Sequence, residues 1–364
     1  MKPVVQSQRF HILDVMRGLA AIVVAERHTN LLFGGPTLAG GYLAVDFFFV
    51  LSGFVIASAY EERLDKGMTT FRFMQIRAIR LYPLYIAALC IGALAFVLSS
   101  RMTDTFNSNA FLITILAGLF FIPLPFRITE ADPQMFPFNF PSWTLLFELF
   151  ANVCHAMVLK SMRIRHLLVV IGVSFLLLVA AALYFGSLDL GYKRTTFVTG
   201  FPRVLFSYTV GIVIYRTGLW RRMPLNLPVI LAPLLLVLVL AIPADGAARM
   251  AVDLICVLVV FPCLVVFSTN LTGGNNWNAA LLRFGSASYA IYVLHLPLFK
   301  LYSAFPSLAG AETIRAMVPY IGLAFLAALI AIAIALDVYF DAPVRKALSR
   351  LLRRKPFSPA PVSP

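Results

Sequence analysis

The chain has 364 residues, of which 60% are hydrophobic, 13% aromatic and only 13% charged, and its mean hydropathy is +0.88. An ordinary soluble domain carries about 25% charged residues, so this composition excludes a cytosolic enzyme, a disordered protein and a secreted disulfide scaffold. The formal net charge of +14 arises from basic residues in short links between apolar runs, a pattern that is typical of membrane proteins rather than of nucleic-acid binders.

Apolar runs of about 20 residues recur along the whole chain and predict an all-α, polytopic bundle of transmembrane helices. The candidate segments are 10–30, 41–60, 82–100, 110–124, 142–159, 167–185, 197–215, 227–243, 250–269, 284–303 and 316–337. Cys90, Cys154, Cys256 and Cys263 lie inside such runs without metal-ligand spacing, so we expect small buried side chains, with no metal site and no disulfide.

Basic residues predict the orientation of the bundle. They cluster in the amino-terminal segment, in the link 61–80 and after residue 343, so we expect both termini to be cytoplasmic. The number of crossings is then even, and one of the eleven segments does not cross. We expect this to be 110–124, the shortest, as a re-entrant segment or half-span.

The sequence therefore predicts about ten spans in a single domain, 1–342, followed by a basic, disordered, Pro- and Ser-rich cytoplasmic tail, 343–364. No soluble catalytic domain is expected beyond it. The basic residues outside the predicted cytoplasmic segments are Arg17, Arg27, Arg101, Arg127, Lys193, Arg194, Arg203, Arg249, Lys300 and Arg315.

Ionisable residues within the first two runs are candidate functional groups, because each costs at least about 2.5 kcal/mol in a span. Arg17 and His28 are eleven residues apart and share one helical face, roughly 16 Å apart along the axis. In the second run, Asp46 and Gly53 share a face, and Asp46 is expected at the depth of His28, where it could orient the imidazole. The alternatives are an interfacial histidine beside an Asp14–Arg17 pair, and a helix-packing seam.

Later runs add further candidates. Arg77 and Arg80 precede the third run and suit a phosphate-bearing ligand, although charges that set topology or contact lipid headgroups have the same pattern. A polar stripe of Thr144, Glu148, Asn152 and His155 follows the interfacial Trp143. In the tenth run, Ser288, Tyr292 and His295 share a face. Both patterns also fit buried hydrogen bonds that only hold helices together.

These residues carry a resemblance. Arg17 and His28 have R-x10-H spacing, Arg77 and Arg80 have RxxR spacing, and residues 45–54, 141–148 and 286–297 form three further motifs. In this order they resemble five motifs of the acyltransferase 3 family of integral membrane enzymes. Thr144 stands where serine is usual, and Asp341 stands in an Asp-Ala-Pro ending where many members have glutamate. We expect no hydrolase-like domain of the kind that some members carry.

The resemblance implies a multi-pass O-acyltransferase of the cell membrane, inner or plasma, that moves an acyl group, commonly acetyl, from cytoplasmic acyl-CoA to a hydroxyl of a carbohydrate or glycolipid. It further implies that His28 is the essential histidine, with Arg17 as its partner, and that Arg77 and Arg80 contact CoA. The expected partners are thus acyl-CoA, the acceptor and the bilayer, without metal or nucleic acid.

For the mechanism, His28 is expected to be the base that deprotonates the acceptor, or the carrier of the acyl group itself. Asp46 or Glu148 is expected to orient it, and Trp143, Tyr292 and His295 are expected to contact substrate. The alternative function is a transporter or flippase for a lipid-linked glycan, since intramembrane charges also mark transport pathways.

Overall fold

The structure is a computed structural model that describes residues 10–35, 38–102, 107–124, 134–221, 225–273, 279–305 and 316–353. Its helices in chain order are α1 (His11–His28), α2 (Ala44–Asp65), α3 (Thr70–Met102), α4 (Ser108–Leu119), α5 (Ser142–Met157), α6 (Ile164–Phe185), α7 (Gly200–Thr217), α8 (Leu231–Leu240), α9 (Gly246–Ile255), α10 (Phe261–Asn270), α11 (Ala279–Ser286), α12 (Ser288–Ser303), α14 (Tyr320–Leu336) and α15 (Ala342–Arg353). All eleven predicted apolar segments are largely helical, and the expected all-α class is confirmed.

Short elements complete the description. Two π-helical segments, Cys256–Val260 and Asp337–Asp341, join α9 to α10 and α14 to α15. The 3-10 turns are η1 (Asn30–Phe33), η2 (Gly41–Leu43), η3 (Leu159–Ser161), η4 (Arg194–Thr199) and η5 (Leu219–Arg221). The strands β1 (Leu225–Pro228) and β2 (Leu271–Gly273) form one small parallel pair, with Leu225 opposite Leu271.

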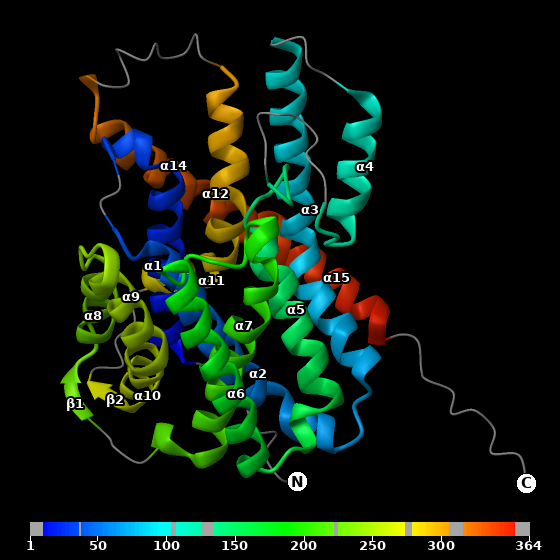
Figure 1. Ribbon diagram of the computed structural model, residues 1–364. Helices are drawn as coiled ribbons and strands as arrows, with labels where there is room; N and C mark the ends of the chain where they lie inside the picture. Colours follow the sequence, from blue (N-terminus) through cyan, green and yellow to red (C-terminus); the bar gives the residue numbers. More distant parts are fainter. Residues whose placement is uncertain are drawn as a thin grey trace, which may run out of the picture.

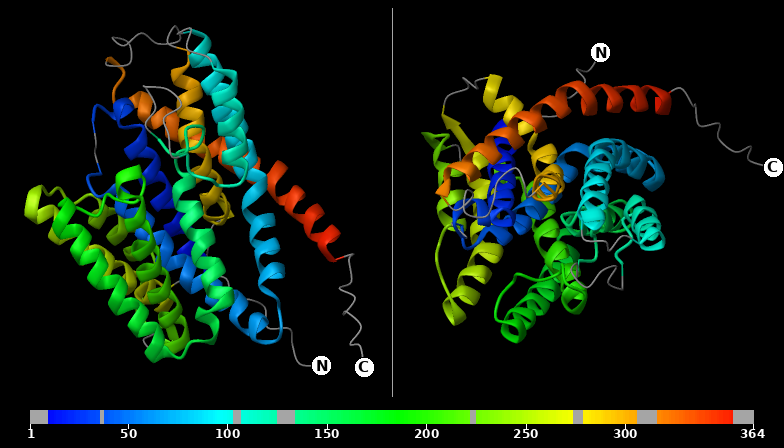
Figure 2. Two further views of the ribbon diagram at one scale, coloured as in Figure 1. Left: turned by 45° about the vertical axis from the view of Figure 1, so that its right-hand side comes forward. Right: turned by 90° about the horizontal axis from the view of Figure 1, so that it is seen from above.

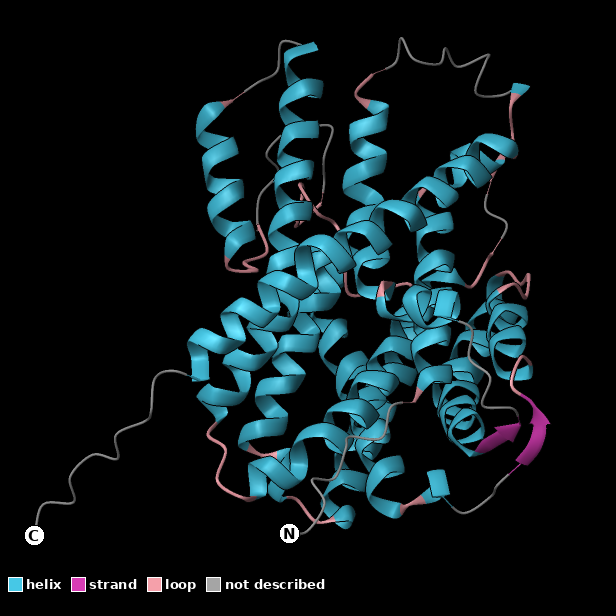
Figure 3. Cartoon of the chain, turned by 180° about the vertical axis from the view of Figure 1, so that it is seen from behind, coloured by secondary structure: helices cyan, strands magenta, loops and turns pink. Residues whose placement is uncertain are grey.

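The helices surround a central group formed by α1, α2, α7 and α12 (Figure 1). Helix α2 packs along α7, and α1 packs against α11 and α12. Helices α6, α8, α9 and α10 lie on one side of this group and α3 and α4 on the other (Figure 2). Helices α14 and α15 run as one long rod obliquely across the back (Figure 3).

Six helical stretches among the described residues are long and apolar enough to cross a membrane, and the α11–α12 pair, bent by 58°, makes a seventh if it is counted as one span. They are Gly41–Asp65, Thr70–Ser100, Ile164–Phe185, Arg194–Thr217, Gly246–Asn270 and Tyr320–Leu352. The chain is therefore a multi-pass membrane protein by composition and length, whereas the ten crossings and the cytoplasmic termini stay predictions.

Length and charge explain why the other predicted spans fall short. Helix α4 has 12 residues and α8 has 10, which correspond to about 18 and 15 Å, well below the roughly 30 Å of a bilayer core. Helix α5 has 16 residues. Helix α1 has 18, but they include Asp14, Arg17, Glu26 and Arg27. The short α4 matches the expectation that segment 110–124 is no full span.

Two predicted boundaries are wrong. The link 61–80 was expected between spans, but only residues 66–69 separate α2 from α3, so Arg77 and Arg80 lie inside a helix. The tail was expected to be disordered from residue 343, but α15 extends to Arg353, and Arg72 on α3 donates a hydrogen bond to the Leu352 carbonyl oxygen at 3.2 Å. In the link, α2 ends at Asp65 before Gly67, which has a positive φ of 97°, and α3 begins at once at Thr70, so the break is far shorter than the run of charges. At residue 343 the chain stays helical, because the π-helical segment Asp337–Asp341 continues directly into α15.

Candidate active site

Helix α1 places Arg17 and His28 in the walls of two different cavities. Arg17 lines a cavity of about 290 Å³, which we call the arginine cavity because Arg77 and Arg80 also line it. His28 lines a second cavity of about 760 Å³, which we call the histidine cavity. Arg17 and His28, eleven residues apart on one helix, therefore line two different cavities.

The arginine cavity is built from the first turns of α1, the first two-thirds of α2, the first third of α3, and parts of α5 and α12. Arg17 donates one hydrogen bond to Ser288 at 2.7 Å and pairs with Asp14 at 3.0 Å. Arg77 pairs with Glu148 at 2.6 Å. Its Nε is buried and has no hydrogen-bond partner within the described residues. The arginines are therefore held in place and retain donor capacity for an anion.

Arg80 is the third cation of this cavity and is held from the far end of the chain. Asp341, fully buried in the π-helical segment before α15, lies 3.5 Å from Arg80 and 2.6 Å from Arg345. Tyr289 lies beneath the Arg80 guanidinium, 5.9 Å from it to the ring centroid. Asp341 was noted in the sequence only as a departure from a motif, so its place beside Arg80 is new information from the fold.

The imidazole of His28, in the wall of the histidine cavity, is paired with that of His295, which is fully buried beside it. The rings of His28 and His295 are stacked with their centroids 5.3 Å apart, and Phe140 meets His28 edge-on at 5.4 Å. His295 Nδ1 lies 2.6 Å from the carbonyl oxygen of Tyr292, which can only accept, so Nδ1 carries the proton. His295 Nε2 is then a free acceptor, buried and unpaired among the described residues.

Val45 and Tyr292 line both cavities and therefore lie at the boundary between them. The Tyr292 hydroxyl is hydrogen-bonded to Thr144 Oγ1 at 2.7 Å, which fixes the ring. Trp143, at the start of α5, is 6% exposed and lines the histidine cavity. The three residues predicted to contact substrate, Trp143, Tyr292 and His295, thus lie in or beside the histidine cavity.

The structure places Asp46 away from its expected position beside the His28 ring. Both Asp46 carboxylate oxygens accept hydrogen bonds from Arg203 on α7, at 2.6 to 3.2 Å, and the two side chains are 0% and 1% exposed. The cause is the face that Asp46 shares with Gly53. A Cβ atom on Gly53 would lie 1.9 Å from the carbonyl oxygen of Tyr208, so this face of α2 lies against α7 and not against α1.

Glu148 also has a different neighbour from the one expected. It lines the arginine cavity, where it binds Arg77 and accepts a hydrogen bond from Ser52 at 3.0 Å. Further along the predicted polar stripe, Asn152 and His155 turn to the buried Tyr208, whose hydroxyl lies 3.1 and 3.2 Å from them. Among the described contacts of His28, the aromatic neighbours are Phe140 and His295, and no carboxylate is among them.

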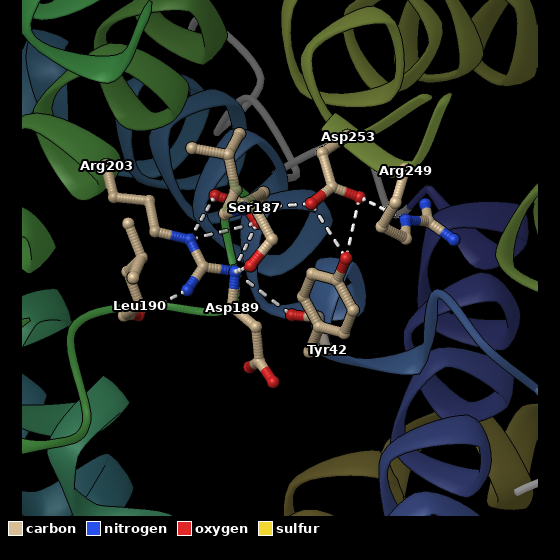
Figure 4. A network of polar contacts seen from close by, with 9 residues as sticks. Tyr42, Ser187, Asp189, Leu190, Arg203, Arg249 and Asp253 are labelled. Atoms are coloured by element: carbon tan, nitrogen blue, oxygen red, sulfur yellow. Dashed lines mark hydrogen bonds and ion pairs between the residues drawn. The ribbon is translucent and has the colours of Figure 1, made fainter. Parts of the chain in front are cut away.

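A polar network anchors the loop beside the histidine cavity (Figure 4). Asp253 on α9 accepts hydrogen bonds from the Tyr42 hydroxyl, from Arg249 and from the Leu188 backbone N–H, at 2.7 to 2.8 Å. Arg203 donates to the carbonyl oxygen of Leu190 at 2.6 Å. With the pair of Arg27 on α1 and Asp189 at 2.7 Å, the segment that leads to Tyr192 is fixed to three helices, α1, α7 and α9. The network joins residues that are far apart in the sequence, and the sequence indicated it only through Arg203, a charge within an apolar run that had no assigned partner.

No cluster of three or more His, Cys, Asp or Glu side chains that could hold a metal ion occurs within the described ranges. The four cysteines are free, but only Cys256 is buried, and Cys90 and Cys263 are exposed. Their expected burial is thus wrong for those two. Apolar runs of a membrane helix have a face toward lipid as well as one toward the bundle.

The sequence profile of a family described as an acyltransferase domain matches residues 10–339. The chain belongs to the acyltransferase 3 family. This membership confirms the resemblance drawn from the five motifs and makes the chain a membrane acyltransferase. The match spans every residue of both cavities.

The sequence of this acyltransferase is similar to those of two rhizobial proteins. It is 36% identical to "Protein 2 in picA locus" of Rhizobium radiobacter over 188 residues, which are 49% of the chain and 97% of that protein. It is 26% identical to "Exopolysaccharide production protein ExoZ" of Rhizobium meliloti (strain 1021) over 267 residues, which are 70% of the chain and 75% of that protein. No solved structure is similar enough to count as a match.

Proposed function

We propose that this acyltransferase moves an acyl group, in the simplest case acetyl, from acyl-CoA to a hydroxyl group of a cell-surface carbohydrate. The donor binds in the arginine cavity and the acceptor in the histidine cavity. The observation that carries the proposal is the meeting of these two cavities at Val45 and Tyr292. Donor and acceptor then enter separately, and their reacting groups meet at the boundary.

The arginine cavity suits the phosphates of CoA. Guanidinium groups bind phosphate oxygens through paired donors, and Arg17, Arg77 and Arg80 converge there against only two lining carboxylates, Asp14 and Glu148. Two of these arginines, Arg77 and Arg80, lie within the basic stretch 61–80, which the sequence predicts to be cytoplasmic. Acyl-CoA from the cytoplasm therefore fits this side, and the apolar wall accommodates the pantetheine arm.

The histidine cavity suits the acceptor. Histidine is the side chain that most often serves as the general base for a hydroxyl group. His28 removes the hydroxyl proton while the oxygen attacks the thioester carbonyl. A C–O bond forms, the C–S bond breaks, and the imidazolium returns the proton to the leaving thiolate, which gives an ester and free CoA. In the alternative route, His28 first carries the acyl group and then passes it to the hydroxyl.

His295 completes this site in place of a carboxylate. Its Nδ1–H is bound to the Tyr292 carbonyl oxygen, so its Nε2 presents a lone pair. Fully buried and stacked on His28, it holds the imidazole of the base in place. Asp46 and Glu148 do not orient His28 in this arrangement, because each carboxylate is already paired with an arginine.

The proposed class of acceptor is supported by the name of one relative. The protein from Rhizobium meliloti is named for exopolysaccharide production, which supports a surface polysaccharide or its lipid-linked precursor as the acceptor of this chain. The enzyme then works in the cell membrane, with its donor on the cytoplasmic side and its acceptor on the opposite side. O-acetylation of a surface glycan is the resulting activity.

The test is incubation of the purified protein with acetyl-CoA labelled in the acetyl group and with surface oligosaccharides. We expect labelled ester that mild alkali releases. Arg80→Gln should raise the KM for acetyl-CoA about tenfold, because one charge-assisted phosphate contact is lost, while Arg163→Gln, an exposed arginine beside α6, should not. Movement of a lipid-linked glycan across vesicles without labelled product would contradict the proposal and favour a transporter.

A further inference from the structure

The histidine cavity is basic where membrane topology does not require it. Its described lining residues include three cations, Arg27, Lys193 and Arg194, and one carboxylate, Asp189. All three cations lie outside the predicted cytoplasmic segments, so the bias that places basic residues inside does not account for them. A basic cavity on this side needs another reason, and binding of an anion is one.

Arg27 and Arg194 differ in whether their guanidinium groups already have an acceptor. Arg27 pairs with Asp189 at 2.7 Å and lies over the Tyr42 ring at 4.9 Å. Arg194 donates only a long bond, 3.4 Å from Nε to the Leu124 carbonyl oxygen. Its Nη2 is buried without a hydrogen-bond partner among the described residues. A buried guanidinium donor without an acceptor costs free energy, and a ligand oxyanion supplies the missing acceptor.

The rest of the wall suits a sugar. Aromatic rings of Tyr42, Phe140, Trp143 and Tyr192 line the cavity, and flat rings pack against the C–H face of a pyranose. Lys193 lies over the Tyr192 ring, 5.4 Å from its centroid, and is exposed to an incoming ligand. The loop that carries Tyr192 and both cations follows directly on the network anchored by Asp253 and Arg203, so the cations hold a fixed position.

We propose that the histidine cavity selects an anionic carbohydrate, whose carboxylate or phosphate is bound by Arg194 and Lys193 while one of its hydroxyl groups reaches His28. This inference rests on the proposed function, in which the acceptor occupies this cavity. The oxyanion has two sources, a uronate within the glycan or the diphosphate that links a glycan to its lipid carrier. Both present the same chemistry to the guanidinium.

Binding and acyl transfer are measured separately with three acceptors: a β-1,4-linked glucose tetrasaccharide, the matching glucuronate tetrasaccharide, and glucose on a short polyprenyl diphosphate. Calorimetry on the full chain in detergent gives the affinity, and labelled acetyl-CoA gives the transfer. The variants are Arg194→Gln, Lys193→Gln and the conservative Arg194→Lys, with the exposed Arg163→Gln as the matched control.

We expect the anionic acceptors to bind about tenfold more tightly than the neutral one, and Arg194→Gln to remove most of this preference without weakening the neutral acceptor. Arg194→Lys keeps part of it, and high salt reduces it. A preference for the glucuronate tetrasaccharide alone identifies a uronate, and one for the diphosphate alone identifies the lipid linkage.

Equal binding of neutral and anionic acceptors, or a preference that survives Arg194→Gln and Lys193→Gln together, overturns the inference. If the neutral acceptor is nevertheless esterified, the proposed function stands while the anion site falls. If charge-dependent binding is found but no acceptor is esterified, the anion site stands and the proposed function falls.

Discussion

At the scale of single residues, the buried pair of Asp46 and Arg203 is expected to contribute to stability rather than to catalysis. Two charges that are 0% and 1% exposed have lost their water, and they are tolerated because Arg203 donates to both carboxylate oxygens and to the carbonyl oxygens of Leu190 and Tyr42. Removal of one partner from such a pair leaves an uncompensated buried charge. Asp46 is therefore expected to hold helices together.

Asp46→Asn should lower the free energy of unfolding by about 3–5 kcal/mol, measured by denaturation in detergent with intrinsic fluorescence. Asp65→Asn, on the exposed end of the same helix, is the matched control and should change stability by less than about 0.5 kcal/mol. A variant Asp46→Asn of normal stability that cannot transfer the acyl group would restore the catalytic role expected from the sequence.

His28→Ala should reduce the rate of acyl transfer by a factor of about 10² to 10⁴, the usual contribution of a general base. His28 lines a cavity and its ring is part exposed, so the protein should still fold and insert, as size-exclusion chromatography of the purified variant would check. His166→Ala, at the exposed start of α6, is the control. Unchanged transfer by His28→Ala would remove the histidine from the mechanism.

At the scale of elements, the contact between α2 and α7 depends on two glycines. A Cβ atom on Gly53 would lie 1.9 Å from the Tyr208 carbonyl oxygen, and one on Gly211 would lie 2.2 Å from the Val50 carbonyl oxygen. Small residues let helix backbones approach this closely, as is common in membrane bundles. The same approach brings Asp46 to Arg203, so the packing of two helices sets the partner of a charge.

Gly53→Ala should therefore destabilise the protein by about 1–3 kcal/mol, the usual cost of overpacking, and lower its unfolding temperature. Gly172→Ala on α6 is the control, because nothing lies within 4 Å of its added Cβ atom. In that helix the change should be neutral or stabilising by up to about 1 kcal/mol. An unfolding temperature for Gly53→Ala equal to that of the wild type would show that the α2–α7 contact is looser than described.

At the scale of the whole molecule, the proposed function requires two cavities that are reached from opposite sides of the membrane. The arginine cavity is lined by the first turns of α1 and α3, and the histidine cavity by the last turn of α1 and the loop through residue 194. Separate entry keeps a hydrophilic donor and a large glycan from competing for one opening. It also requires that residues 66 and 193 be on different sides.

Single cysteines test this requirement once the four native cysteines are replaced by alanine. A membrane-impermeant maleimide applied to intact cells should label Lys193→Cys, and should label Lys66→Cys only after the cells are permeabilised. Both native side chains are exposed, so access to solvent is not limiting. Labelling of both variants from the same side would end the two-sided route, although the family assignment would remain.

Much of the molecule was predictable because membrane helices and family motifs are local patterns. Each of the eleven apolar runs is largely helical in the structure, and the spacing of Arg17 and His28 predicted one face of one helix. The neighbours of Asp46, Glu148 and Arg80 were not predictable, because depth in the membrane does not say which face of which helix is adjacent. The sequence also misplaced the ends of α2, α3 and α15, because runs of charged residues were interpreted as the ends of helices, whereas a helix can continue beyond its apolar part.

By itself, the sequence determined that this chain is a helical membrane acyltransferase and which side chains carry its motifs, because hydropathy and motif spacing depend only on neighbours along the chain. The tertiary structure alone decided that the three motif arginines and His28 line separate cavities, that His28 stacks on His295 and that Asp46 binds Arg203. Those pairings follow from close helix packing, in which a glycine at one contact fixes which distant charges meet.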